Sequence, residues 1–101
     1  MLAPAPSLST QTLAQFCERH HIRKLALFGS VLTDRFHAES DVDVLVDFEV
    51  GHVPGFIRLA GMERELAALY GRHVDMRTPE DLSRDFREQV VTGAVVQYER
   101  R

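Results

Sequence analysis

Two aspartates separated by one residue, Asp41 and Asp43, stand at the start of an apolar run that is typical of a buried strand. Side chains alternate between the two faces of a strand, so both carboxylates project from the same face. Like charges held side by side repel each other, and the pKa of one carboxyl rises unless a cation lies between them. Mg²⁺ suits such oxygen ligands, because it keeps several waters and takes further ligands from a substrate phosphate. The pair therefore predicts a magnesium site that acts on a phosphorylated substrate.

A phosphate-binding turn is predicted ten residues before this pair, at Gly29 and Ser30. The turn ends the short apolar run 24–28, which indicates a buried strand. Glycine has no Cβ and permits a tight turn in which backbone N–H groups approach a ligand, and the serine hydroxyl adds a donor. Ser40 immediately precedes the acidic pair and is a candidate for orienting either Asp41 or the loop. One half of this constellation would hold phosphate and the other half the metal.

A third aspartate, Asp75, interrupts the short apolar run 73–76, which indicates another strand. Taken alone, this residue has two interpretations. It is either an exposed residue of an edge strand or a further carboxylate of the site, because perturbed acids gather at functional clefts. The residues alone leave both interpretations open.

The order of these motifs resembles a known superfamily. A Gly-Ser pair, ten residues, an Asp-x-Asp pair and a later acidic strand are similar to the signature of the DNA polymerase β-like nucleotidyltransferases. Within that superfamily, the stretch LALFGSVLTDRFHAESDVDVLVDF resembles the minimal nucleotidyltransferases, the MNT family. The likeness covers the chain from about Ile22 to the C-terminus. It favours the catalytic interpretation of Asp75.

The resemblance implies a reaction in which AMP is transferred from ATP to a hydroxyl group with the help of two Mg²⁺ ions. It implies that the catalytic and metal-binding residues are Asp41, Asp43 and Asp75. It implies that the nucleotide is bound by Gly29, Ser30, Ser40 and Arg35. Relatives often carry a basic residue directly after the Gly-Ser pair, where this chain has Val31, Leu32 and Thr33. Arg35 or His37 is the candidate replacement.

The resemblance also implies a partner, since MNT proteins are similar to antitoxins paired with HEPN-type ribonuclease toxins and modify a toxin tyrosine with AMP. Two alternatives stay open. The chain could neutralise the toxin simply by covering it, or it could transfer a nucleotide to a small-molecule hydroxyl. Its net charge of −3 and its pI of about 5.9 argue against a direct grip on nucleic acid.

The chain of 101 residues is expected to form one domain over 8–101 after a flexible lead-in at 1–7. We expect an α/β fold, a small mixed sheet of three to four strands with helices packed on one side, in the order α-β-α-β-α-β-α. Its elements are predicted as a helix from Ser9 to about His20, strands at 23–28, 42–48 and 73–76, a short helix that begins at 31–32, and helices at 56–70 and 78–98. The lone Cys17, and the lack of a signal peptide or a long apolar run, predict a cytoplasmic protein without membrane contact.

Overall fold

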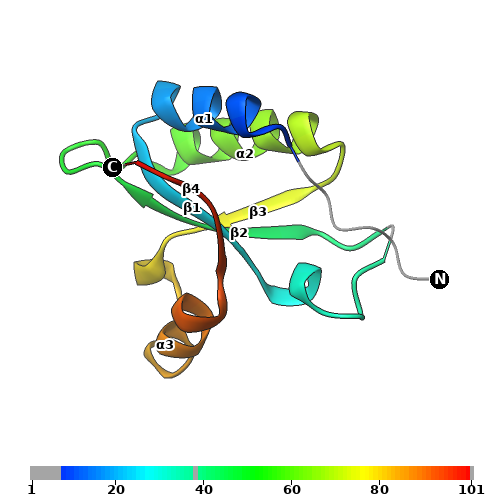
Figure 1. The fold of residues 1–101 in the computed structure, drawn as a ribbon. Helices are drawn as coiled ribbons and strands as arrows, with labels where there is room; N and C mark the ends of the chain where they lie inside the picture. Colours follow the sequence, from blue (N-terminus) through cyan, green and yellow to red (C-terminus); the bar gives the residue numbers. More distant parts are fainter. Residues whose placement is uncertain (1–7, 38, 101) are drawn as a thin grey trace.

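The fold is organised on a four-stranded sheet, seen in a computed structural model that describes residues 8–37 and 39–100. The predicted lead-in at 1–7 lies outside the described residues. The strands are β1 (Ile22–Phe28), β2 (Val42–Phe48), β3 (Val74–Arg77) and β4 (Val95–Glu99), in the spatial order β3-β2-β1-β4 (Figure 1). Strands β2 and β3 are parallel, whereas β1 is antiparallel to both β2 and β4. The predicted mixed sheet is therefore confirmed.

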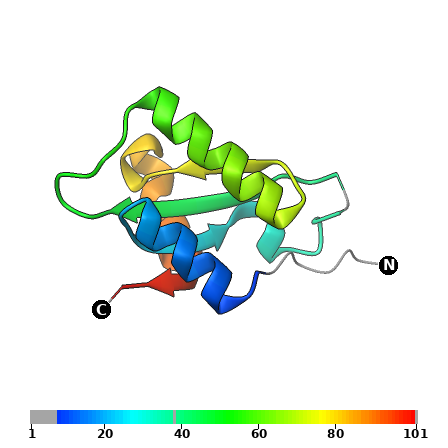
Figure 2. The same ribbon diagram turned by 90° about the horizontal axis from the view of Figure 1, so that it is seen from above.

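Helices α1 (Thr10–Arg19) and α2 (Phe56–Tyr70) lie side by side over one face of this sheet (Figures 1 and 2). The alternation of β2 explains why they do, since Val42, Val44 and Val46 all point into the core beneath them and are fully buried. Phe16 of α1 and Leu66 of α2 fill the same core. No helix in the described part of the chain is long and apolar enough to span a membrane.

Local sequence signals set the ends of both helices. The Ser9 hydroxyl accepts a hydrogen bond from the N–H of Thr12 at 3.1 Å, as expected of an N-cap residue. Gly71 ends α2 in the left-handed conformation with a φ of 70°. A charged contact then joins the helices, because Glu65 of α2 pairs with Arg19 and His20 at the end of α1. Both helix boundaries agree with the sequence prediction.

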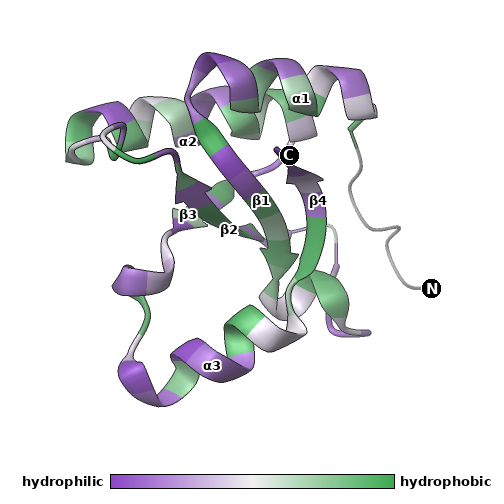
Figure 3. Ribbon diagram, turned by 60° about the vertical axis from the view of Figure 1, so that its left-hand side comes forward, coloured by the Kyte–Doolittle hydropathy of each residue, from purple (hydrophilic) through white to green (hydrophobic). Residues whose placement is uncertain are grey.

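The C-terminal segment differs from its prediction as one helix over 78–98. A single turn of 3₁₀ helix at Pro79–Asp81 is followed by α3 (Arg84–Gly93), and the chain then enters β4. The four-residue spacing of apolar side chains is genuine, but the β-branched residues Val95 and Val96 pair with β1 instead. Helix α3 lies on the side of the sheet away from α1 and α2 (Figures 1 and 3). None of its residues is buried.

Candidate active site

The Gly-Ser turn lies directly against the acidic strand. Strand β1 ends at Phe28, which pairs with Asp43 of β2, and the chain then turns through the 3₁₀ helix Gly29–Leu32. Gly29 has a φ of +79°, and a Cβ at this position would lie 2.5 Å from Oδ2 of Asp43. Only glycine fits here, because the conformation is strained for other residues and the carboxylate occupies the space of a side chain. The turn and the carboxylate therefore form one unit.

Asp43 lies at the centre of three carboxylates. Asp75 is its register partner on the parallel strand β3, and Asp41 immediately precedes β2. Burial of the side chain raises the pKa of Asp43, and the neighbouring charges of Asp75 and Asp41 raise it further, while Arg77 acts in the opposite direction. The Asp41 side chain, by contrast, is 55% exposed to water.

Each of the outer carboxylates has a basic side chain beside it. Oδ2 of Asp75 lies 3.2 Å from the guanidinium of Arg77, and Oδ1 of Asp41 lies 3.3 Å from Nδ1 of His73. Within residues 8–37 and 39–100, no three His, Cys, Asp or Glu side chains are gathered closely enough to hold a metal ion. The donor set nevertheless fits Mg²⁺, which needs only one or two protein carboxylates when a substrate phosphate supplies further oxygens.

The remaining predicted nucleotide-binding residues lie in the turn and in the loop between the two strands. The carbonyl of Ser30 accepts two hydrogen bonds from Thr33, so the backbone of the turn is fixed. The Ser40 hydroxyl accepts a hydrogen bond from the N–H of His37 at 3.0 Å and thereby shapes the loop. Arg35 is exposed on the same loop, and among the described residues its side chain forms no ion pair with the carboxylates.

The turn and the carboxylates lie within a stretch of the chain that matches a known protein family. The model of the nucleotidyltransferase domain matches residues 10–96, which include the turn and all three carboxylates. The chain belongs to the nucleotidyltransferase domain family. It is 36% identical over 70 residues to the protein adenylyltransferase MntA of Thermococcus cleftensis, covering 69% of each chain.

Solved structures share the fold of this nucleotidyltransferase. A structure described as a minimal nucleotidyltransferase is 31% identical, with a TM-score of 0.70, and the match covers 85% of this chain and 86% of that one. A complex of the tri-AMPylated Shewanella oneidensis HEPN toxin with an MNT antitoxin is also similar, at 20% identity and a TM-score of 0.64. That match covers 89% of this chain and 69% of the other, and it concerns the fold alone.

Sequence reasoning missed three basic residues of this nucleotidyltransferase site. Arg77 could have been found, because it lies two residues after Asp75 on a strand and therefore shares its face. His73 and Arg72 carried no such signal, since their positions depend on how the loop before β3 approaches the loop before β2. Their contacts are a tertiary property.

Arg72 holds the loop that leads to Asp41. Its guanidinium donates hydrogen bonds to the carbonyls of His37 and Ser40, at 2.9 and 3.2 Å, and its Cζ lies 4.5 Å from the centre of the Phe36 ring. Phe36 is itself buried, so the cation is fixed on a rigid platform. Arg72 therefore joins the loop after α2 to the loop that enters the acidic strand.

Proposed function

We propose that this chain is a protein adenylyltransferase that moves AMP from ATP to a tyrosine hydroxyl of a partner HEPN-type toxin, and that it thereby acts as the antitoxin. The observation that carries the proposal is the close approach of Gly29 to Asp43, with Asp41 and Asp75 beside it. A chain that only covered its target would have no use for a glycine in the left-handed conformation that makes room for the carboxylate of Asp43. The likeness to MntA supports the same conclusion.

The carboxylates would act together on the nucleotide. Asp41 and Asp43 share the face and the end of β2 that meet the Gly-Ser turn, so they are the residues we expect to bind Mg²⁺. Asp75 would complete the metal site from the neighbouring strand. Two Mg²⁺ ions held by these carboxylates would supply the positive charge that neutralises the phosphate oxygens. Burial and the neighbouring carboxylates raise the pKa of Asp43, and a cation held beside it would lower this pKa again and keep the carboxyl ionised.

The Gly-Ser turn would hold the leaving group. Backbone N–H groups of the turn and the Ser30 hydroxyl are donors that suit the terminal phosphates of ATP. The Ser30 hydroxyl forms no hydrogen bond with the residues that the structure describes. Most of the rate enhancement in such a transfer comes from positioning and charge neutralisation rather than from covalent chemistry by the protein.

The transfer itself is a single displacement at the α-phosphorus. The acceptor oxygen forms a bond to this phosphorus while the bond to the bridging oxygen of the β-phosphate breaks, and pyrophosphate leaves. The acceptor proton would pass to Asp75, which faces the site beside Asp43. Arg77 remains close to Asp75 and would balance its charge when no metal is bound.

A protein acceptor is supported by the complex of an MNT antitoxin with a tri-AMPylated HEPN toxin. Attachment of AMP would place a bulky anion on the toxin, where it competes with the phosphates of RNA. We expect the pair to act in the cytoplasm. The only cysteine, Cys17, is a free thiol on the buried face of α1, which fits a reducing compartment.

The proposal is tested first by titrating ATP with Mg²⁺ into the purified chain. We expect micromolar binding, about −8 kcal/mol, that requires Mg²⁺ and is lost in Asp43→Asn. Asp47→Asn is the matched control, because Asp47 lies farther along the same strand, where it pairs with Arg23 at 3.4 Å. The partner toxin is then incubated with each protein and ATP, and its mass is measured for added AMP.

Three outcomes would each contradict a different part of this proposal. Full toxin modification by the double variant Asp41→Asn/Asp43→Asn would show that the site assignment is wrong. Neutralisation of the toxin by this variant without any modification would favour the alternative, in which the chain acts by covering its partner. Modification of a small molecule in the absence of the toxin would instead identify the third candidate function.

A further inference from the structure

An open groove borders the Gly-Ser turn on the carboxylate face of the sheet. Its volume is about 420 Å³, which falls within the range of small-molecule sites. One wall comes from the end of β1 and the turn after it, and the other comes from α3. The side chains and backbone that line it include those of Phe28, Gly29, Leu32, Gln89, Val90 and Gly93.

The groove is continuous with the catalytic residues. Phe28 is the register partner of Asp43, so its side chain projects from the same face directly beside the carboxylate. Gly29, which also lines the groove, is the residue whose Cα faces Oδ2 of Asp43. A group in the groove is therefore close to a phosphate held at Asp43.

The walls are suited to a flat, largely apolar group with a polar edge. Phe28 and Val90 offer an aromatic ring and an aliphatic side chain, and Leu32 is 42% exposed although it is apolar. Gln89 is exposed on α3, and its amide both donates and accepts hydrogen bonds, which matches the edge of an adenine. Gly93 adds no side chain, which leaves this end of the groove open.

In-line geometry decides which substrate can occupy the groove. The attacking and leaving oxygens lie on opposite sides of the phosphorus. If the Gly-Ser turn holds the leaving pyrophosphate, the acceptor hydroxyl approaches from the other side of Asp43, where Asp75 lies. The groove is on the β1 side, so an acceptor tyrosine cannot use it during transfer. A nucleobase attached through the ribose to the α-phosphate has no such restriction.

We propose that the groove between β1 and α3 binds the purine base of the donor nucleotide, with Phe28 against the ring and Gln89 at its edge. The proposal rests on the function proposed above and adds the site that selects the nucleotide. It also gives a role to α3, which has no buried residue of its own. A bound base would join this helix to the sheet.

The test compares ATP with inorganic tripolyphosphate, a probe that has the phosphates but no base, both with Mg²⁺. Wild type is expected to bind ATP at least tenfold more tightly. Phe28→Leu and Gln89→Leu should each weaken ATP binding about tenfold, the effect of losing a base contact, and leave tripolyphosphate binding unchanged. Gln11→Leu, an exposed glutamine on α1, is the matched control and should change neither.

Hydrogen exchange supplies an independent readout. ATP should slow exchange of the backbone N–H groups of α3, whereas tripolyphosphate should not. Equal wild-type affinity for the two probes, or equal weakening of both by the variants, would overturn the base site but leave the proposed function standing. Failure of the wild type to bind either probe would instead contradict the proposed function itself.

Discussion

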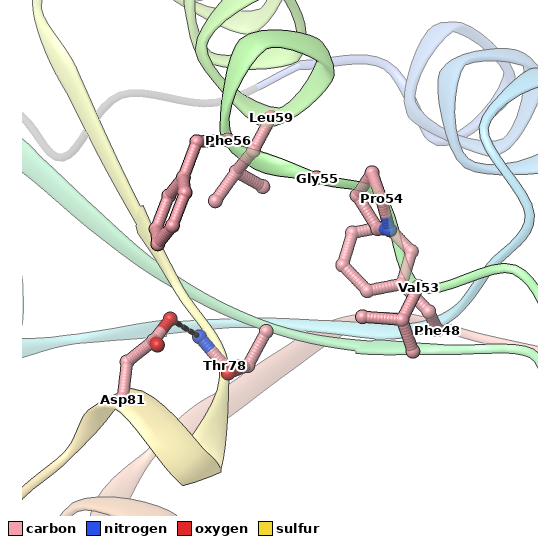
Figure 4. Close-up of a pocket in the computed structure, with 8 residues that line it drawn as sticks. All are labelled: Phe48, Val53, Pro54, Gly55, Phe56, Leu59, Thr78 and Asp81. Carbon is pink, nitrogen blue, oxygen red and sulfur yellow. Dashed lines mark hydrogen bonds between the residues drawn. The ribbon is translucent and has the colours of Figure 1, made fainter.

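The two ends of strand β2 differ in chemistry although they belong to one strand. At its start, Asp43 is pressed against Gly29 and lies beside two further carboxylates. At its end, Phe48 helps to line an apolar cavity of about 200 Å³. Figure 4 shows Phe56 and Leu59 on one side of this cavity and Val53 and Pro54 on the other, with the Thr78–Asp81 hydrogen bond near its base. The acidic and apolar ends are thus separated by the length of one strand.

Each end departs from what stability alone would favour. At the acidic end, burial and then the neighbouring like charges raise the pKa of Asp43. The apolar end exposes large side chains to water, with exposed fractions of 99% for Val50, 72% for Val53 and 89% for both Phe56 and Ile57. Clustered exposed apolar groups usually mark a contact surface, and clustered carboxylates usually mark a metal or a catalytic site. The comparison suggests that chemistry and contact are assigned to opposite ends of the sheet.

Replacement of Asp43 by asparagine should give the largest effect and should separate activity from stability. AMP transfer should fall by about a thousandfold, because the residue that holds the metal and phosphate is lost. Without metal, the Asp43→Asn variant should be more stable than the wild type at neutral pH. The folded-state pKa of Asp43 is raised, so its ionisation costs stability above that pKa, and the cost disappears as the pH falls through it. Thermal unfolding at several pH values with EDTA measures this difference.

Asp47→Asn provides the contrast within the same strand. Its carboxylate lies toward the apolar end, beside Arg23. The variant should keep its activity and should gain no stability. A loss of stability in Asp43→Asn at neutral pH would show that the acidic end is not strained in the absence of metal.

Two glycines with similar backbone conformations sharpen the comparison further. Gly29 and Gly51 have φ values of +79° and +84°, at the acidic and the apolar end respectively. A Cβ at Gly51 would meet nothing within 4 Å. Gly51→Ala should therefore lower the free energy of unfolding only by the cost of the left-handed backbone conformation, about 1–2 kcal/mol. Gly29→Ala must also displace Asp43, so it should be more destabilising and should abolish metal-dependent ATP binding. Denaturant unfolding and titration of both variants measure the difference, and equal effects would contradict it.

Arg72→Met tests whether the loop before Asp41 must be held in place. The variant keeps an apolar stem but loses the two hydrogen bonds to the carbonyls of His37 and Ser40. We expect kcat to fall about tenfold to a hundredfold, because a small displacement of a catalytic group is costly, while KM for the partner stays unchanged. Arg72→Lys retains the cation over Phe36 and should recover part of kcat. A uniform loss of stability without a change in kcat would reduce Arg72 to a structural role.

Much of this arrangement could be predicted from the sequence, since it depends on local patterns. The Gly-Ser turn, the shared face of Asp41 and Asp43, and the strand of Asp75 follow from spacing and alternation, and the structure places these three segments together. The C-terminal strand β4 could not be predicted in this way, because its valines fit a helical period equally well and only pairing with β1 decides between the two. The contacts of Arg72 were hidden for the same reason.

The double variant Phe56→Ser/Ile57→Ser should have the smallest effect on the catalytic residues. Both side chains are almost fully exposed, so their loss should change the free energy of unfolding by no more than about 0.5 kcal/mol. Because these residues lie at the far end of β2 from Asp43, ATP binding should be the same as in wild type. Titration of ATP with Mg²⁺ and denaturant unfolding test both expectations. Weaker ATP binding would show that the two ends are coupled through the strand. It would contradict the idea that catalysis and partner contact are separated between the two ends of β2.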